Sequence, residues 1–259
     1  MSGTPLRVNL TPAFVLHQRP FRDTSLIVEV FARDHGRLTT FARGARGARG
    51  VRRSGTGRFA CLQPFQRLLL SWHGRGEAPQ LIAAEGDGVA LPLPPQHWLS
   101  GCYLSELLLK LTAQHDPQPG LFALYEGALQ RLAASEAAEP VLRQFEKQLL
   151  ELLGFGLELD SDAGTGEPVR SDAHYRFDTG DGLHRDESGS DSAYSGRMLR
   201  ALADGELLTE PALLHEARAL MRQAIDHCLE GRELRTRSVA RSIARLERSA
   251  ATAREAPSA

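Results

Sequence analysis

One proline-rich segment, Leu91-Pro92-Leu93-Pro94-Pro95, divides the chain into two parts with different hydrophobic patterns. Before this segment, apolar residues form short runs that are separated by Gly, Pro and Asp. After it, apolar residues recur three and four positions apart, as they do on one face of an α-helix. The sequence therefore predicts two domains, at residues 1–90 and 91–248, and a disordered tail at residues 249–259.

The first domain is expected to consist of β-strands that are rich in Val, Ile, Phe and Thr. The expected strands are residues 14–17, 25–32, 38–42, 65–72 and 80–84. Their spacing, with turn residues between them, favours a small barrel over a βαβ unit. A five-stranded oligonucleotide-binding (OB) barrel has this number of strands.

The second domain is expected to be all-α. Amphipathic helices are predicted at residues 98–113, 121–133, 141–153, 195–202, 210–229 and 234–246. A stretch rich in Gly, Asp and Ser, at residues 156–192, interrupts this pattern and is expected to be an irregular excursion. The predicted fold class is therefore α+β multidomain, with an OB barrel followed by a helical domain.

The charge of the chain is distributed unevenly, although the formal net charge is only −1. Residues 1–75 contain thirteen arginines and three acidic residues, whereas the other 184 residues contain 18 basic and 29 acidic ones. A strongly basic region of this kind is typical of a surface that faces a polyanion.

Many of these arginines lie in the repeat Arg43-Gly44-Ala45-Arg46-Gly47-Ala48-Arg49-Gly50 and shortly after it. Glycine keeps such a segment flexible, and the guanidinium fork matches phosphate oxygens without reading bases. A solvated loop without a ligand is the other interpretation. The predicted nucleic-acid-binding residues are Arg22, Arg37, Phe41, Arg43, Arg46, Arg49, Arg52, Arg53 and Arg58.

Two further features of the sequence allow more than one interpretation. Phe41, Phe59, Phe65 and Trp72 either stack on unpaired bases or pack in the core, and for each of them the core is favoured. A second basic stripe, on one face of the last helix, is either solvated, an extension of the nucleic-acid surface or a dock for an acidic peptide. The stripe consists of Arg237, Arg241, Arg245 and Arg248.

The sequence contains no motif that indicates an enzyme, a cofactor or a metal site. The GxGxxA match at residues 55–60 lacks the strand-to-helix context of a dinucleotide site. Cys61, Cys102 and Cys228 are widely spaced and form no CxxC pair, which is typical of a reducing cytoplasm. No apolar run approaches the length of about 18 residues that a membrane span needs.

Several segments of the chain form a distinctive pattern when they are taken together. The opening segment is Phe14-Val15-Leu16-His17-Gln18-Arg19-Pro20-Phe21-Arg22-Asp23-Thr24-Ser25-Leu26. Later segments are Leu62-Gln63-Pro64-Phe65, Leu142-Arg143-Gln144-Phe145-Glu146 and Leu152-Leu153-Gly154-Phe155-Gly156. With these segments the chain resembles the RecO family of bacterial DNA repair proteins, and the resemblance is collinear from about residue 13 to residue 245.

This resemblance implies a mediator of recombinational repair, cytoplasmic and associated with the nucleoid, with an OB barrel and a helical domain. It implies binding to single- and double-stranded DNA, annealing of complementary strands and, together with RecR, loading of RecA onto strands coated by single-strand binding protein. Some members hold zinc with four cysteines in the excursion. Here Asp162, Thr165, His184 and Glu187 stand at roughly those places, so no zinc is expected.

The resemblance also implies that the helical domain contacts the acidic C-terminal tail of the single-strand binding protein. Arg143 is the candidate cation for this tail, with Leu142 and Leu149 as apolar neighbours, although Arg143 would equally suit an ordinary exposed position. Two alternative functions remain open from the residues alone. They are an OB-fold RNA-binding or ribosome-associated factor and, less favoured, a hydrolase that uses the acidic excursion.

Overall fold

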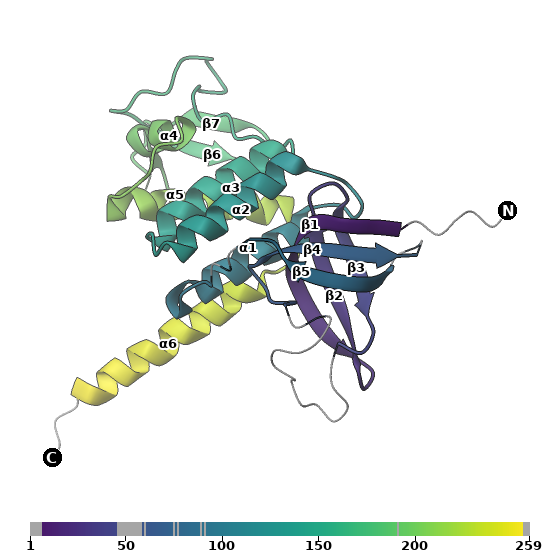
Figure 1. Ribbon diagram of the computed structural model, residues 1–259. Helices are drawn as coiled ribbons and strands as arrows, with labels where there is room; N and C mark the ends of the chain where they lie inside the picture. The colour runs from purple at the N-terminus through teal and green to yellow at the C-terminus, as the bar shows by residue number, and fades with distance from the viewer. Residues whose placement is uncertain are drawn as a thin grey trace.

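The computed structural model describes residues 7–45, 59, 61–74, 76, 78–88, 90, 92–190 and 192–255, without the side chains of residues 250–255. The strands of the N-terminal part lie on one side of the molecule and the helices on the other, and the last helix extends away from both (Figure 1).

The N-terminal part is a closed five-stranded barrel. Its strands are β1 (Arg7–Phe21), β2 (Ser25–Ala32), β3 (Gly36–Ala42), β4 (Arg67–His73) and β5 (Gln80–Gly86). Neighbouring strands follow the order β1-β2-β3-β5-β4, and β3 pairs with β5 in parallel whereas the other pairs are antiparallel. This topology is of the OB type and confirms the predicted barrel.

Alternation along the strands fills the barrel interior with aliphatic side chains. On β3, for example, residues 36, 38, 40 and 42 are buried, and the residues between them are partly exposed. The interior also holds Trp72, which is 2% exposed. Trp72 is therefore a core residue, which was the favoured interpretation, and it offers no face to a base.

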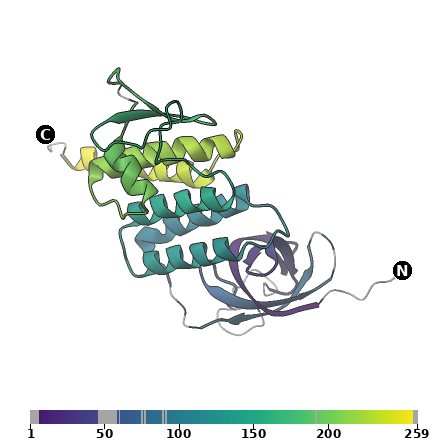
Figure 2. The same cartoon turned by 90° about the horizontal axis from the view of Figure 1, so that it is seen from above.

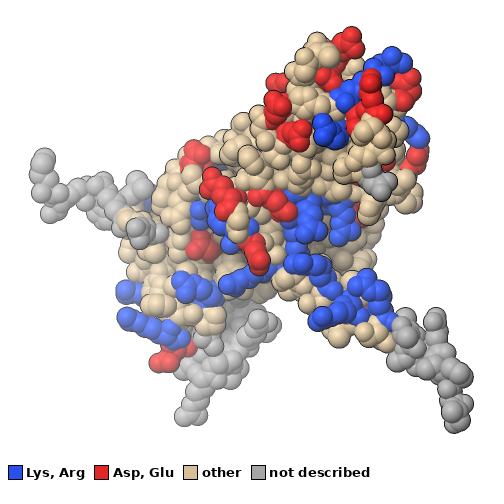
Figure 3. Space-filling model, turned by 180° about the vertical axis from the view of Figure 1, so that it is seen from behind, with Lys and Arg blue, Asp and Glu red and all other residues tan. Residues whose placement is uncertain are grey.

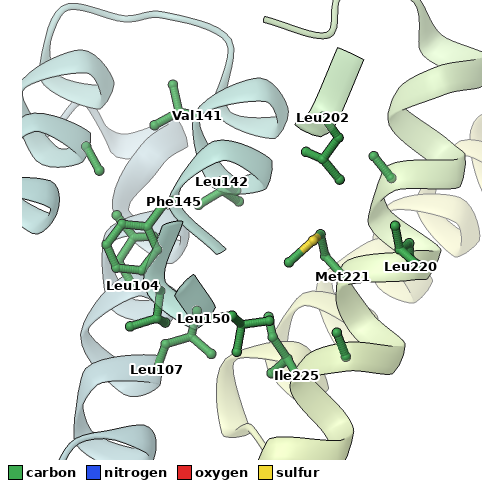
Figure 4. Packing of buried hydrophobic residues seen from close by; sticks show 14 of the residues in the cluster. Leu104, Leu107, Val141, Leu142, Phe145, Leu150, Leu202, Leu220, Met221 and Ile225 are labelled. Carbon is green, nitrogen blue, oxygen red and sulfur yellow. The ribbon is translucent and has the colours of Figure 1, made fainter. Parts of the chain in front are cut away.

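The helical part contains the six predicted helices (Figure 2). They are α1 (Trp98–Leu111), α2 (Pro119–Ala133), α3 (Ala138–Leu152), α4 (Gly196–Ala203), α5 (Pro211–Cys228) and α6 (Arg235–Glu255), with a 3₁₀ turn, η1 (Pro95–His97), before α1. Helices α3 and α5 face each other across a core in which Leu142, Leu150, Met221 and Ile225 meet (Figure 4).

The barrel and the helical part share one hydrophobic core. Phe14 and Phe31 point outward from the barrel, and their rings lie 5.1 and 5.9 Å from the ring of Phe122 on α2. The ring of Tyr125 meets Phe14 edge-on at 5.2 Å. Each buried aromatic ring stabilises the folded state by roughly 1.5–3 kcal/mol, so the two parts are held in one relative orientation.

A second contact between the two parts lies at the turn between β2 and β3. Gly36 has φ +68°, and a Cβ atom there would lie 2.2 Å from the carbonyl oxygen of Asp116. The next residue, Arg37, accepts a hydrogen bond of 2.8 Å at its carbonyl from the backbone N–H of His115. Only glycine allows the two backbones to approach so closely.

The excursion is less irregular than the sequence predicts. It contains the strands β6 (His174–Asp178) and β7 (Gly182–Arg185), which form a small sheet with β8 (Tyr194–Ser195) in the order β7-β6-β8. Tyr175, Phe177 and Leu183 are apolar residues of this sheet, and all three are buried in the core of the helical part. Since they alternate with polar residues over a short distance, a hairpin buries them efficiently.

The last helix differs from its predicted bounds. Helix α6 continues to Glu255, whereas the sequence predicts a disordered tail from residue 249. Ala250, Ala251 and Ala253 favour a helix, which explains the additional turns. Among the described residues, no helix is long and apolar enough to cross a membrane.

Candidate functional site

Two phenylalanines form a partly exposed pair on the barrel. Phe21 ends β1 and Phe41 lies on β3, on either side of β2. Their ring centroids are 5.3 Å apart, and the rings meet edge-on at 84°. Both side chains are half-buried, in contrast to the fully enclosed Trp72.

An arginine lies over each ring of this pair. The guanidinium carbon of Arg22 is 5.3 Å from the centroid of Phe21, and that of Arg43 is 5.7 Å from the centroid of Phe41. Both arginines are exposed, and within the described residues neither forms an ion pair. These four residues are called the aromatic–arginine cluster, which joins stacking faces to cations that no acid neutralises.

The predicted arginine loop continues from this cluster. Arg43 is the last arginine before a segment that the structure leaves undescribed. The predicted residues Arg46, Arg49, Arg52, Arg53 and Arg58 lie outside the described residues. Their role in binding stays a prediction.

Arg37 occupies a different environment from the one expected of a phosphate-binding residue. Its guanidinium donates hydrogen bonds to the carbonyl oxygen of Thr112, the shorter of them 2.9 Å, and lies 3.8 Å from a carboxylate oxygen of Glu29. The side chain is only 15% exposed, and burial lowers its pKa although Glu29 opposes the shift. Arg37 therefore joins the barrel to α1 and is not part of the aromatic–arginine cluster.

Phe65, another candidate for stacking, is also a core residue. It is 7% exposed, and its ring meets the edge of Trp98 at 5.4 Å. Phe59 packs against the barrel core. Of the four aromatic residues considered from the sequence, only Phe41 belongs to the cluster on the barrel surface.

The helical part carries a groove of about 350 Å³ between α1, α3, α5 and α6. Its apolar lining includes Leu99, Leu142, Ala240 and Ala244. Its basic lining consists of Arg143, Arg218, Arg222, Arg237 and Arg241. Basic side chains gather at the centre of this face and along the projecting α6 (Figure 3). We call this feature the arginine groove.

Four of the groove arginines lie close to acidic side chains of the same chain. Glu139 is 3.9 Å from Arg143 and 3.5 Å from Arg218. Asp226 forms an ion pair with Arg237 and lies 3.6 Å from Arg222. Burial alone would lower the pKa of Arg237, but Tyr103 and Asp226 raise it.

Beneath Arg143 lies a buried carboxylate. Glu146 is fully buried, and its Oε1 accepts a hydrogen bond of 2.6 Å from Tyr103 and forms an ion pair of 3.0 Å with Nη2 of Arg143. Burial raises the pKa of Glu146, because the charged carboxylate is removed from water. Arg143 is itself 5% exposed, and its Nε has no hydrogen-bond partner among the described residues.

The groove contains some of the predicted partner-binding residues and excludes another. Leu142 and Arg143 line it, whereas Leu149 has no exposed surface and belongs to the core between the helices. The sequence interpretation missed Tyr103, Arg218 and Arg222. Arg218 and Arg222 stand one helical turn apart on α5, a spacing that places both on one face.

The predicted basic stripe on α6 is divided between two environments. Arg237 and Arg241 line the groove. Arg245 and Arg248 follow along the projecting part of the helix, and the apolar residues Val239, Ile243 and Leu246 are exposed. The backbone N–H groups of Arg235 and Thr236 donate to the carboxylate of Glu106 on α1, which holds the start of α6 in place.

The four residues that the resemblance aligns with a zinc site, Asp162, Thr165, His184 and Glu187, have other partners in the structure. Asp162 accepts hydrogen bonds from the backbone N–H groups of Gly164, Thr165 and Arg185 and from the Thr165 hydroxyl. His184 pairs with Asp181, and Glu187 points into solvent. Within the described residues no three His, Cys, Asp or Glu side chains form a metal-binding group. The Asp162 carboxylate thus ties this loop to β7.

Fold and sites together define a two-domain protein with an OB-type barrel and a helical domain. Comparison with protein-family models places both parts in one family. The model described as "Recombination protein O N terminal" matches residues 7–86, and "Recombination protein O C terminal" matches residues 95–238. The chain belongs to the RecO family.

Curated relatives agree over almost the whole chain. A protein of Alkalilimnicola ehrlichii named "DNA repair protein RecO" is 46% identical over 257 residues, which cover 98% of each chain. A protein of the same name from Methylococcus capsulatus is 43% identical and covers 93% of this chain and 96% of its own. One from Azoarcus sp. is 40% identical and covers 93% of this chain and 98% of its own.

Proposed function

We propose that the protein is a DNA-binding mediator of recombinational repair that anneals complementary strands without covalent chemistry. The observation that carries this proposal is the aromatic–arginine cluster on an OB-type barrel, where Phe21 and Phe41 lie beneath Arg22 and Arg43. An aromatic ring can stack on any unpaired base, and an unpaired arginine binds phosphate regardless of sequence. Membership of the family supports a role in DNA repair.

In this proposal residues 1–90 form the DNA-binding domain and residues 91–248 the partner-binding domain. The undescribed segment with Arg46, Arg49, Arg52, Arg53 and Arg58 extends the DNA surface from Arg43. A surface that neutralises two strands at once lowers their mutual repulsion, so annealing needs only binding. The protein acts in the cytoplasm on the nucleoid and, with RecR, helps to load RecA.

DNA binding is tested by titrating a fluorescent single-stranded oligonucleotide at several salt concentrations. We expect log K to fall with log salt by about 0.7 for each phosphate contact. Changing Arg46, Arg49, Arg52 and Arg53 together to alanine should lower both the affinity and this slope. A flat salt dependence would contradict a phosphate-binding role. Strand annealing with and without the coat protein then tests mediation.

We also propose that the arginine groove binds the acidic C-terminal tail of the single-strand binding protein. Apolar residues such as Leu99 and Leu142 line the same groove as five arginines, a combination that suits a peptide with carboxylates and an apolar end. Arg143 is held at the floor, where its side chain is largely shielded from water. A shielded arginine attracts a carboxylate more strongly than an exposed one.

The clean variant for this groove is Arg241→Ala. Arg241 forms no ion pair among the described residues, so its removal leaves no acid of the chain unpaired. We expect binding of the tail peptide to weaken about tenfold, as for loss of one charge-assisted contact. Arg200→Ala on α4, which does not line the groove, is the control. Undiminished affinity of Arg241→Ala would place the tail elsewhere.

An RNA-binding factor is the alternative function, because barrels of this kind bind both nucleic acids. Competition between DNA and RNA oligonucleotides of equal length distinguishes the two. Equal or tighter binding of RNA would favour the alternative.

A further inference from the structure

We propose that the carboxylates of Glu139 and Asp226 compete with an acidic peptide for the arginines of the groove. The peptide must displace both carboxylates, and this requirement limits the affinity of the groove for the peptide. This inference rests on the proposed binding of an acidic peptide to the groove. It adds that four of the five groove arginines already lie within 4 Å of a carboxylate of the same chain.

Glu139 bridges two of the groove arginines from the first turn of α3. Its Oε1 lies 3.5 Å from Nη1 of Arg218, and its Oε2 lies 3.9 Å from Nε of Arg143. The second distance is too long for a hydrogen bond, and Nε of Arg143 is buried without one. A donor at the groove floor is therefore left for a better-placed carboxylate.

Asp226 makes the matching arrangement on α5. One of its oxygens pairs with Arg237, and the other lies 3.6 Å from Nε of Arg222. The two acids together contact four of the five groove arginines, each acid bridging one pair. A ligand with a single carboxylate would replace only one of the bridges. The geometry therefore selects a peptide with at least two carboxylates.

The exposure of these acids distinguishes them from Glu146. The side chains of Glu139 and Asp226 are 43% and 49% exposed, so each can rotate into water without losing packing. Glu146 has a side-chain exposure of 1% and is held by Tyr103 and Arg143. The Glu146 carboxylate therefore stays beneath Arg143 when a peptide binds. It positions the Arg143 guanidinium and does not compete with the peptide for it.

Displacing Glu139 and Asp226 from the arginines opposes peptide binding in two ways. Their ion pairs with the arginines must break, and their charges stay near the bound carboxylates and repel them. Each acid is about half exposed and has one exposed partner, Arg218 or Arg222, and exposed ion pairs are weak. Each acid is therefore displaceable and should reduce the affinity only moderately. Replacing either acid by its amide should tighten peptide binding about threefold to tenfold, and replacing both should tighten it further.

The test uses the full-length protein and a fluorescein-labelled peptide of four aspartates that ends in leucine, followed by fluorescence anisotropy. The variants are Glu139→Gln, Asp226→Asn and the double variant. Glu136→Gln is the matched control, because Glu136 pairs with Arg131, which does not line the groove. The two amide variants should bind more tightly than the wild type, and the control should bind equally.

The outcomes separate the two proposals. Tighter binding by the amide variants supports the competition, including the case in which only the double variant binds detectably. If the wild type binds and loses affinity with Arg241→Ala, but the amide variants bind no more tightly, the competition is overturned and the groove keeps its function. If neither the wild type nor the double variant binds the peptide, both proposals fail.

Discussion

The barrel and the helical part both present arginines, but these arginines differ in whether acidic side chains lie close to them. Arg22 and Arg43 are exposed over aromatic rings and form no ion pair among the described residues. In the arginine groove, by contrast, Arg143, Arg218, Arg222 and Arg237 each have an acid within 4 Å. Among the described residues, the positive charges of Arg22 and Arg43 therefore have no acidic partner, whereas those of the four groove arginines are partly neutralised.

This difference matches the two kinds of ligand that we propose. A nucleic-acid backbone is a long and uniform polyanion, and it is bound by mobile cations whose contribution depends on salt. A short peptide must be bound in one register, which requires arginines that are already oriented. Glu146 provides this orientation for Arg143, whereas Glu139 and Asp226 are proposed to lower the affinity for the peptide.

The largest expected effect concerns the acid beneath the groove. Glu146→Ala should lower the free energy of unfolding by about 3–5 kcal/mol, because it leaves Arg143 buried without its closest counter-charge. Glu151→Ala is the control, since Glu151 is an exposed partner of Lys147, and its loss should cost about 1 kcal/mol or less. Denaturant unfolding measures both. Equal effects would mean that Glu146 is no more structural than a surface acid.

The next effect concerns the aromatic rings of the barrel. Changing Phe21 and Phe41 to alanine should weaken single-stranded DNA binding by about 1–3 kcal/mol for each base that loses a stacking partner. Duplex binding should change less, because paired bases are not available to the rings. Phe155→Ala is the control, because Phe155 is an exposed phenylalanine in the segment that follows α3. Equal losses for both forms of DNA would remove stacking from the proposal.

A third effect tests an acid that faces no arginine side chain. Asp162→Asn should lower the free energy of unfolding by about 1–3 kcal/mol, because the amide cannot accept all the hydrogen bonds of the carboxylate. Burial raises the pKa of Asp162, but hydrogen bonds from Arg185 and Thr165 outweigh it and lower the pKa overall.

The sign of the pH dependence follows from this lowered pKa. The contribution of the Asp162 carboxylate is complete above its unfolded pKa of about 3.9 and is lost as the pH falls through the lower native value. Urea unfolding between about pH 2 and pH 7 should therefore show a smaller loss of stability in acid for Asp162→Asn than for the wild type. Parallel curves would contradict this role.

The smallest effect separates the two sets of arginines by salt. Arg22→Ala and Arg43→Ala should each reduce the slope of log K against log salt for single-stranded DNA by about 0.7. Arg241→Ala should leave that slope unchanged, because the groove is proposed to bind peptide. A reduced slope for Arg241→Ala would instead join α6 to the DNA surface.

Much of the architecture could be predicted from local patterns. The barrel and all six helices are confirmed, and the last barrel strand, β5, ends at Gly86 before α1 begins at Trp98. Periods of 2 and 3.6 residues are properties of a short stretch of chain, so they are visible in the sequence. The small sheet of the excursion was missed, because Tyr175, Phe177 and Leu183 are too few to establish a period.

The sequence by itself therefore determined the order of the barrel strands and of the six helices, the basic first third and the family resemblance. Only the tertiary structure decided what each charged side chain meets. Arg37 links the barrel to the helical part, and Leu149 lies in the core. Arg143 lies at the floor of a groove that α5 and α6 complete. The reason is that a side chain's dielectric environment and partners come from residues far away along the chain, which pattern and composition do not specify.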